Sequence, residues 1–299
     1  MKSKNLVNGW FFLDKPIGMT SNLALQKIRK KFNNCKAGFV GTLDPLASGN
    51  LPIALGNATK IISYIEKVNK KYLFTIEWGL KTDTGDLEGD IIERRKIFPN
   101  LDNIKKVLLK FTGGIKQEPP KFSSVKINGI RAYKLARDKV PFSTNLKKIF
   151  IRKIKLLSVL SKERAFFYVE CSSGTYIRSL AEDIAFSLGT LGTVTELRRI
   201  GFGQCNKKLI SLDYLVSLRH SDELNKLIHP VDVILNEVNE IQLSELQVKK
   251  LLTGQFVEIK NFFEEMKGNK FAIAKYKKKV IAIGLIEKSF FYPKKLLIT

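Results

Sequence analysis

A single aspartate lies in a short glycine-rich segment, which runs from Gly38 to Gly49 and contains Asp44 followed by Pro45. Proline lacks an N–H group and disfavours the helical conformation at the preceding residue, so we expect Asp44 to be held extended. Glycines allow a substrate to approach the backbone closely, and a carboxylate presented there can act as a base or a nucleophile. Local physics alone favours a plainer interpretation, a turn in which Asp44 caps the following backbone, and the spacing does not decide between the two.

Other common forms of catalytic chemistry lack their usual signals. The chain has two histidines and three widely spaced cysteines without a Cys-x-x-Cys pair, so histidine-based catalysis, metal sites and disulfides are not expected. It has no Gly-x-Gly-x-x-Gly or Walker pattern for nucleotide binding. The tripeptide Asp83-Thr84-Gly85 matches aspartic proteases, but such an enzyme needs two aspartates that share a proton, so one copy would require a symmetric dimer.

The charge balance indicates a polyanionic partner. The chain carries 52 Lys and Arg against 28 Asp and Glu, a formal net charge of +24, and nucleic acid is the partner class that best offsets such an excess. Residues 91–180 hold 21 basic and six acidic side chains, whereas residues 77–90 hold five acids and one lysine. We interpret the basic window as a source of phosphate contacts, with a solvated lysine surface as the alternative.

The length of the chain and its apolar runs indicate a globular protein without membrane segments. The 299 residues suit about two domains with a substantial core. The longest apolar run, Val280 to Ile286, is seven residues, far short of the roughly 20 that span a bilayer. The apolar stretch Trp10 to Leu13 is too short for a signal-peptide core. We therefore expect a protein without membrane segments that acts in the cytoplasm.

Periodic patterns predict the elements that position Asp44. Thr20-Ser21 can cap a helix that ends near residue 32, a second helical pattern covers 61–68, and the glycine-rich segment 38–56 between them is expected to be a loop. Alternation predicts a strand from Tyr72 to Trp78.

Further patterns follow along the chain. Helices are expected at 104–111 and 177–188, a loop at 119–124 and a strand at 166–171, with Arg178 in the first turn of the second helix and off its apolar stripe. Ser244 and Gln247 form a capping-box pattern, and strands at 256–259, 271–276 and 280–286 predict a small β-rich module that begins near residue 240.

Two motifs, Leu13 to Asn22 and Gly41 to Gly49, carry a resemblance to a known family. In their order and spacing they resemble the TruB family of tRNA pseudouridine synthases. The likeness covers roughly residues 5–200 and continues through Lys71-Tyr72, Thr82 to Asp86, Gln117 to Pro120, Phe122 to Lys126, Cys171 to Arg178 and Leu197 to Arg199. The tail is similar to the family's small RNA-binding PUA-type module.

The resemblance implies an α+β fold, the pseudouridine synthase fold. Its central sheet is mixed, largely antiparallel and flanked by helices, and a small β-rich PUA-like module follows at the C-terminus. We expect the catalytic domain over residues 1–238 and the module over residues 239–299.

The implied activity is isomerisation of one uridine, at position 55 in the T-loop of tRNA, in which uracil detaches at N1 and rejoins C1′ through C5. No cofactor and no metal are needed, the partner is the T-stem-loop of tRNA, and we expect a monomer. Asp44 matches the catalytic aspartate. Its ionised carboxylate would start cleavage of the glycosidic bond by attack on the sugar or base, or by abstraction of a sugar proton, and the sequence leaves these routes open.

Two further residues match catalytic positions of the family. Arg178 matches the arginine that pairs with the aspartate and keeps it ionised, with an ordinary phosphate contact as the alternative. Tyr72 matches the tyrosine that stacks on the target base and assists proton removal from C5, with a packed core residue as the alternative.

The target nucleotide must be flipped out of its stack before this chemistry. Leu197 matches the leucine that packs against the flipped uracil, and Tyr176 is expected to line the same pocket. Lys15 and Lys60 match basic positions that serve substrate positioning or loop structure. Phe39 stands where the bacterial family usually has histidine; it can stack or wedge, so we expect catalysis to be preserved and affinity to change.

Two other functions stay open. One is a non-catalytic RNA chaperone that binds tRNA through the 91–180 surface and the tail, with Asp44 merely structural. The other is the guide-RNA-dependent relative of the family, the catalytic subunit of a ribonucleoprotein.

Overall fold

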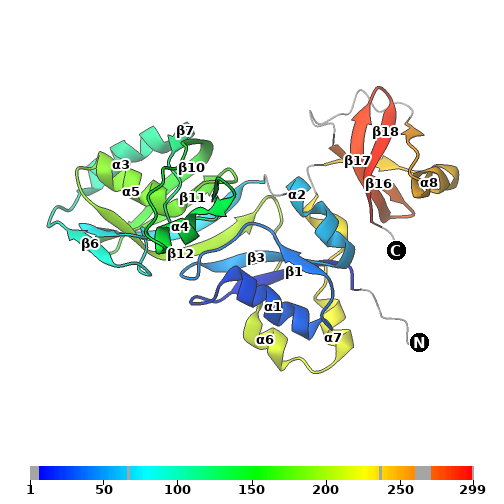
Figure 1. Cartoon of the computed structure of the whole chain (residues 1–299), viewed down its shortest axis with the longest axis horizontal. Helices are drawn as coiled ribbons and strands as arrows, with labels where there is room; N and C mark the ends of the chain where they lie inside the picture. Colours follow the sequence, from blue (N-terminus) through cyan, green and yellow to red (C-terminus); the bar gives the residue numbers. More distant parts are fainter. Residues whose placement is uncertain (1–6, 66–67, 236–237, 260–270, 298–299) are drawn as a thin grey trace.

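The computed structural model describes residues 7–65, 68–235, 238–259 and 271–297. A nine-stranded sheet runs through the larger part of the chain (Figure 1). Its strands, in spatial order, are β13 (Ile210–Ser211), β1 (Gly9–Lys15), β3 (Ser48–Leu55), β12 (Gly192–Phe202), β4 (Lys70–Trp78), β11 (Arg164–Cys171), β10 (Lys147–Val159) and β7 (Gly113–Gln117), with β2 (Ala37–Phe39) paired to β3.

A short parallel contact joins the two halves of this sheet. Strand β12 pairs with β3 through only two residue pairs, Arg198 with Ser48 and Arg199 with Gly49, whereas it pairs antiparallel with β4 along almost its whole length. Only β1 with β13 and β3 with β12 are parallel among the pairs of this sheet. The predicted α+β class with a mixed, largely antiparallel sheet is therefore confirmed.

Helices cover one face of the sheet and build the main core. Helices α1 (Ser21–Lys31), α3 (Leu101–Leu108) and α5 (Ile177–Ser187) pack their apolar residues against one side of β1, β3, β4 and β11. The predicted caps are confirmed: the Thr20 side chain accepts a hydrogen bond from the Leu23 N–H at the start of α1. This core fixes α1 and α5 on either side of the segment that carries Asp44.

A second sheet forms the C-terminal part of the described chain, at the right of Figure 1. Its strand order is β14 (Asn239–Gln242), β16 (Phe271–Tyr276), β17 (Lys279–Glu287), β18 (Phe290–Leu296) and β15 (Val257–Glu258), with α8 (Glu245–Leu252) beside it. The capping box of Ser244 and Gln247 is confirmed. The expected boundary between residues 238 and 239 lies directly before β14, and the division into domains stays a prediction.

The C-terminal sheet contacts the helical segment 56–65, and the two share a core with residues on the opposite face of the large sheet. Phe271 stacks on Tyr64 of α2 (Ile62–Ile65) with ring centroids 4.7 Å apart, and both belong to a core that includes Trp10 of β1. Lys60 donates from Nζ to the carbonyl oxygen of Leu296 over 2.8 Å. Of the two roles open for Lys60, this contact supports a structural one.

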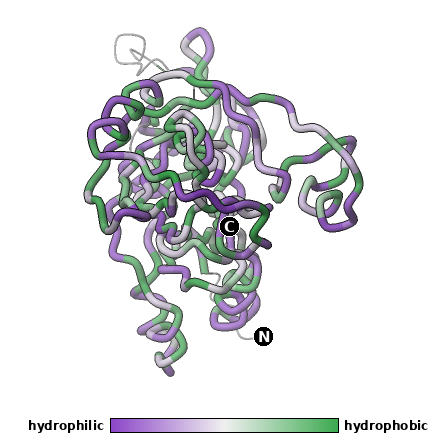
Figure 2. Tube along the Cα trace, turned by 90° about the vertical axis from the view of Figure 1, so that its left-hand side faces the viewer, coloured by the Kyte–Doolittle hydropathy of each residue, from purple (hydrophilic) through white to green (hydrophobic). Residues whose placement is uncertain are grey.

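Shorter elements complete the described fold. They are β5 (Leu80–Thr82), β6 (Ile91–Arg94), β8 (Lys126–Ile127), β9 (Ile130–Arg131), α4 (Ala132–Arg137), α6 (Leu212–Ser217) and α7 (Ser221–Lys226), with 3-10 turns at Gly56–Ile61, Leu109–Phe111 and Val231–Ile234. In Figure 2 hydrophobic and hydrophilic residues alternate along most of the tube. Among the described residues, no helix is long and apolar enough to cross a membrane.

One expectation about the elements is wrong. The segment 38–56 was expected to be a loop, but it contains most of β2 and all of β3. The strand was missed because β3 is buried on both faces and so lacks alternation, and because Gly49 and Pro52 within it are typical of loops. The helical pattern at 61–68 is confirmed by α2 as far as Ile65, and residues 66–67 lie outside the described residues. The expected strands at Tyr72 and in 166–171 and the helix at 177–188 are confirmed.

The close approach at the sheet junction gives a stability prediction. Gly49 has φ of +98°, and a Cβ there would lie 2.3 Å from the carbonyl oxygen of Arg199. Gly113 has φ of +96° with nothing within 4 Å of its Cβ position, so Gly113→Ala isolates the backbone strain. We expect Gly113→Ala to cost about 1 to 2 kcal/mol and Gly49→Ala at least about 2 kcal/mol more, as measured by urea denaturation. Equal losses would contradict the close packing at this junction.

Candidate active site

The carboxylate of Asp44 lies at the junction of the two sheet halves, in the connection between β2 and β3. The residue before Asp44, Leu43, is fixed by the buried hydroxyl of Ser21, the first residue of α1. This hydroxyl accepts a hydrogen bond from the Leu43 N–H over 2.8 Å and donates one to the Leu43 carbonyl over 2.9 Å. The carbonyl of Asp44 accepts from the Ala47 N–H over 3.0 Å. A turn is therefore present at Asp44, but a backbone hydrogen bond forms it. The Asp44 side chain does not cap the turn and is free to bind another group.

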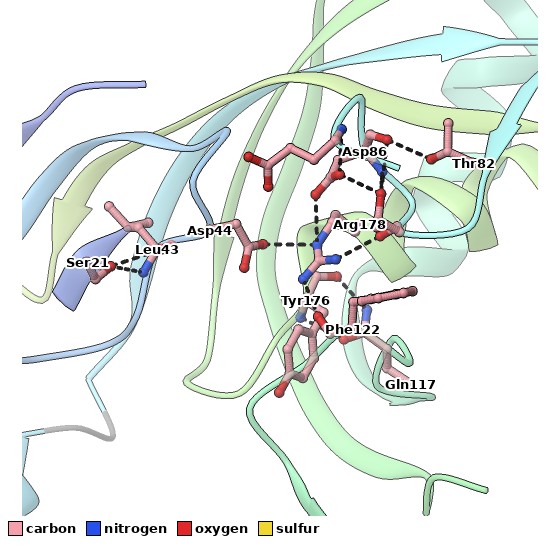
Figure 3. A network of polar contacts seen from close by, with 11 residues as sticks. Ser21, Leu43, Asp44, Thr82, Asp86, Gln117, Phe122, Tyr176 and Arg178 are labelled. Carbon is pink, nitrogen blue, oxygen red and sulfur yellow. Dashed lines mark hydrogen bonds and ion pairs between the residues drawn. The ribbon is translucent and has the colours of Figure 1, made fainter. Parts of the chain in front are cut away.

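That partner is Arg178, in the first turn of α5. Its Nε lies 2.9 Å from Oδ2 of Asp44 (Figure 3), with the arginine side chain 5% exposed and the aspartate side chain 36% exposed. The two terminal nitrogens of Arg178 donate to the carbonyls of Thr84 over 2.7 Å and Phe122 over 3.0 Å. The guanidinium is thus fixed by three separate segments, and one side of the Asp44 carboxylate stays open to solvent.

A second carboxylate, that of Asp86, lies behind the arginine. Its Oδ2 is 3.5 Å from the Nε of Arg178, and its Oδ1 accepts from the Thr84 hydroxyl over 2.6 Å and from the Glu88 N–H over 3.0 Å. Asp86 is buried. It supports the arginine from the protein side, whereas Asp44 faces outward, so the two aspartates occupy different places in one network.

Burial and charge act on the Asp44 carboxyl in opposite directions. Burial raises its pKa, the guanidinium of Arg178 lowers it, and the negative charge of Asp86 raises it again. The ion pair with Arg178 is therefore the main interaction that favours the ionised form of Asp44. Burial and the charges of Asp86 and Asp44 also raise the pKa of Glu88, at the rim of the same network.

The backbone of Tyr176 is fixed beside the arginine. The side-chain amide of Gln117 accepts from the Tyr176 N–H over 2.8 Å and donates to its carbonyl over 3.1 Å. Burial raises the pKa of the Tyr176 phenol, and the positive charge of Arg178 lowers it. In Figure 3 the Tyr176 ring lies beneath the Arg178 guanidinium. The phenol is near enough to Arg178 and Asp44 for their charges to act on its pKa, and its place in a base pocket stays a prediction.

Tyr72 and Leu197 lie on neighbouring strands and face the main core. Tyr72 of β4 pairs with Arg199 of β12, and Leu197 of β12 pairs with Phe74 of β4; Tyr72 and Leu197 are both buried. Burial raises the pKa of the Tyr72 phenol, Arg199 lowers it, and the charge of Asp44 is among the smaller causes that raise it. Tyr72 is therefore within electrostatic reach of Asp44, and the base contacts of Tyr72 and Leu197 stay predictions.

Lys15 and Phe39 are less exposed than residues that contact a substrate are expected to be. The ammonium of Lys15 is fully buried and donates to the carbonyls of Pro16, Met19 and Pro45, and burial lowers its pKa to about 8. These contacts support a role in the structure of the Asp44 segment. Phe39 of β2 is half-buried against the main core, and its contact with RNA stays a prediction.

Several residues of the site were not singled out from the sequence. Ser21 serves two functions, as first residue of a helix and as clamp on Leu43. Gln117 belongs to a motif quoted for the resemblance, which was a signal for it. The carbonyls of Thr84 and Phe122 carry no sequence signal, since any residue has one. Among the described residues, no group of three or more His, Cys, Asp or Glu side chains is arranged to hold a metal ion.

Comparison with known proteins shows the family. The model described as "TruB family pseudouridylate synthase (N terminal domain)" matches residues 29–177, and the one described as "tRNA pseudouridylate synthase B C-terminal domain" matches residues 178–236. The first match contains Asp44 and the second begins at Arg178, so the ion pair connects the two matched regions. The chain belongs to the TruB family.

Curated relatives of the TruB family extend over most of the chain. A protein of Ehrlichia canis named "tRNA pseudouridine synthase B" is 42% identical over 85% of this chain and 86% of its own length. Proteins of the same name from Caulobacter sp. and Bartonella henselae are 35% and 36% identical; they cover 86% and 97% of this chain, and the matches span 83% and 96% of those proteins.

Solved structures agree on the TruB-like fold. A chain of the "Crystal Structure of a Cbf5-Nop10-Gar1 Complex" matches with a TM-score of 0.73 and 25% identity, over 98% of this chain and 86% of that chain. A chain of the "Crystal structure of the archaeal box H/ACA sRNP Nop10-Cbf5 complex" matches with a TM-score of 0.73 at 23% identity, over 98% and 87%. The expected pseudouridine synthase fold with a C-terminal PUA-like domain is confirmed.

The clamp on Leu43 gives a prediction for the site. Ser21→Ala removes one hydroxyl that satisfies two buried backbone groups, so we expect a loss of about 2 to 4 kcal/mol in the free energy of unfolding by urea denaturation. Ser217→Ala is the matched control, because the Ser217 hydroxyl is exposed and donates only to the Tyr214 carbonyl; its effect should stay within about 0.5 kcal/mol. Similar losses in both variants would exclude the clamp.

Proposed function

We propose that this chain is a tRNA pseudouridine synthase that isomerises the uridine at position 55 in the T-loop, with Asp44 as its catalytic residue. One observation carries the proposal: the ion pair of Asp44 with Arg178, whose aspartate is open to solvent while its arginine is buried. Such a pair keeps a carboxylate ionised and aimed outward. The names of the curated relatives support tRNA as the substrate class.

The proposed reaction moves one uracil between two bonds of the same nucleotide. The ionised carboxylate of Asp44 acts on the nucleotide as a nucleophile, on the sugar or the base, or as a base that takes a sugar proton; the bond from C1′ to N1 breaks, and C1′ is rejoined to C5. The C5 proton is then lost and N1 gains a proton. The reactant and the product have the same atoms, so the proposal includes no cofactor and no metal.

The pocket for the flipped base is proposed from residues around the ion pair. The ring of Tyr176 and the side chain of Leu197 replace the stacking that the uracil loses, Tyr72 contacts the base, and Phe39 wedges beside the vacated stack. The basic window at 91–180 supplies phosphate contacts for the T-stem-loop. We propose that the enzyme acts as a monomer in the cytoplasm.

The two alternative functions are less well supported. A non-catalytic chaperone has no use for a buried arginine that holds one carboxylate open to solvent. The solved structures of similar fold include a chain of an archaeal box H/ACA sRNP complex. The curated relatives with 35% to 42% identity are named as tRNA enzymes, which favours a chain that needs no guide RNA.

A substitution of Asp44 tests its proposed role in catalysis. Asp44→Asn should abolish pseudouridine formation in unmodified tRNA, as mapped by carbodiimide reactivity at the T-loop uridine, while binding of tRNA persists. Asp102→Asn, at an exposed residue in the first turn of α3, is the control and should keep full activity. A T-stem-loop hairpin without guide RNA should also be modified by the native chain. Unaltered isomerisation by Asp44→Asn would exclude the proposed catalyst.

The pH dependence of the reaction is tested with two substitutions that should shift the pKa of Asp44 in opposite directions. The charge of Arg178 lowers the pKa of Asp44 and that of Asp86 raises it. Because activity needs the ionised carboxylate, the acidic limb of the single-turnover rate should move to higher pH in Arg178→Gln and to lower pH in Asp86→Asn. We expect the first shift to be about one pH unit, equivalent to about 1.4 kcal/mol. Shifts of the same sign, or none, would contradict this electrostatic account.

A further inference from the structure

One buried side chain at the end of β7, that of Gln117, holds the start of α5. Gln117 is 1% exposed. Its Oε1 accepts from the Tyr176 N–H over 2.8 Å, and its Nε2 donates to the Tyr176 carbonyl over 3.1 Å (Figure 3). Because both hydrogen bonds go to the backbone of the same residue, the amide fixes the position and the orientation of Tyr176 together.

Tyr176 is the residue at which α5 begins, and no side-chain hydrogen bond from Tyr176 caps the helix. Its carbonyl also accepts from the Leu180 N–H over 3.0 Å, which is the first hydrogen bond of the helix. In a capping box, a Glu or Gln three positions later binds the N–H of this first residue. That position in α5 is Ser179, and Gln117 supplies the contact from another strand instead.

The next residue of the chain holds α5 on the other side of Arg178. The Ser179 hydroxyl donates to the Glu118 carbonyl over 2.8 Å. Two consecutive residues at the end of β7 therefore bind Tyr176 and Ser179, and Arg178 lies between these two in the sequence. The guanidinium of the proposed catalytic ion pair thus extends from a backbone that is held on both sides.

Packing alone does not require an amide at position 117. A methionine is also long and unbranched, and it buries no polar group that has to be paired. The amide alone provides a donor and an acceptor at a fixed spacing. Both are directed at the residue that begins α5, which favours a role in orienting the first turn of the helix over a role in filling the core.

We propose that Gln117 is a positioning residue for the catalytic ion pair: it fixes the backbone of Tyr176 so that the Arg178 side chain reaches Asp44. This rests on the proposed function, which makes that ion pair catalytic. Gln117 acts through α5 and makes no contact with the reacting nucleotide. The same two hydrogen bonds orient the ring of Tyr176 in the proposed base pocket.

Removal of the amide tests this role in rate and binding. Gln117→Met should lower the single-turnover rate by about tenfold or more, and the Kd for tRNA should change by less than about twofold because no charge is lost. Gln26→Met is the matched control, because Gln26 is exposed on α1 and accepts only from Arg29 over 3.4 Å. Its rate should stay within about twofold of the native rate. A native rate in Gln117→Met, or a loss confined to Kd, would overturn the proposal.

Gln117→Glu makes the contact depend on pH and decides the matter even if Gln117→Met does not fold. An ionised carboxylate can accept from the Tyr176 N–H but cannot donate to its carbonyl, whereas a protonated carboxyl group can do both. Burial raises the pKa of such a group, so the ratio of variant to native rate should rise at least about fivefold from about pH 8 to about pH 5.

The sign of this pH effect separates positioning from a simple effect of charge. A negative charge at position 117 that acted only by raising the pKa of Asp44 would make the ratio fall as the pH falls. Gln26→Glu, the matched control for added charge, should give a constant ratio. A ratio for Gln117→Glu that falls or stays constant would overturn the proposal.

Other charged and titratable groups around this segment are common to the native chain and the variant. They are Lys116 and Glu118 beside position 117, Lys147 opposite it on β10, and Tyr176, Arg178 and Asp183 at or in α5. Burial and the charge of Glu118 raise the pKa of Asp183 to about 6. Because Asp183 titrates in both proteins, it does not produce a change in the ratio of their rates.

An NMR measurement without RNA separates the positioning role from the proposed function. The Nε–H of Arg178, paired with Asp44 at 2.9 Å, gives a ¹H–¹⁵N signal that is assigned by its loss in Arg178→Lys. In Gln117→Met its exchange with water should be at least about tenfold faster than in the native chain. Unchanged exchange would overturn the positioning role. Faster exchange in a protein whose native chain forms no pseudouridine would support that role and count against the proposed function alone.

Discussion

A buried guanidinium must find acceptors for all its N–H groups, and the segments of the candidate site are arranged around that requirement at Arg178. Its acceptors come from the connection before β3, from the loop after β5 and from the loop after β7. The arginine therefore serves as the point at which loops of the two sheet halves meet, and the only outward-facing member of the set is the carboxylate of Asp44.

The same requirement explains how two aspartates near one arginine can differ. Asp86 is enclosed by Thr84, the Glu88 N–H and Arg178, so its oxygens are occupied. Asp44 places one oxygen on the arginine, and its side chain is 36% exposed. The proposed chemical role is therefore given to the carboxylate that solvent can reach, and the buried one is left to support the arginine. The acidic stretch at 77–90, unusual in a basic chain, contributes Asp86 to this arrangement.

Much of this could be read from the sequence, for a physical reason. Side chains that carry chemistry must be particular residue types at particular places, so motifs record them, and the proposed pair of Asp44 and Arg178 was found in this way. Amphipathic elements such as the strand at Tyr72 were predicted because one face is apolar. Strand β3 was missed because burial on both faces removes the alternation, and Pro52 and Gly49 are typical of loops. Lys15 was matched as a basic residue, but only the fold shows its ammonium enclosed by carbonyls.

Three cations, Lys15, Arg178 and Arg199, share one feature: most of their hydrogen bonds go to backbone carbonyls. A carbonyl is the same in every residue, so the cation constrains the path of the chain at its acceptor and not the identity of the side chain there. The acceptor positions can therefore drift in evolution while the geometry is kept. Homologous sequences should preserve these cations more strictly than the residues that bind them, and comparison of sequences alone would underestimate how large the catalytic framework is.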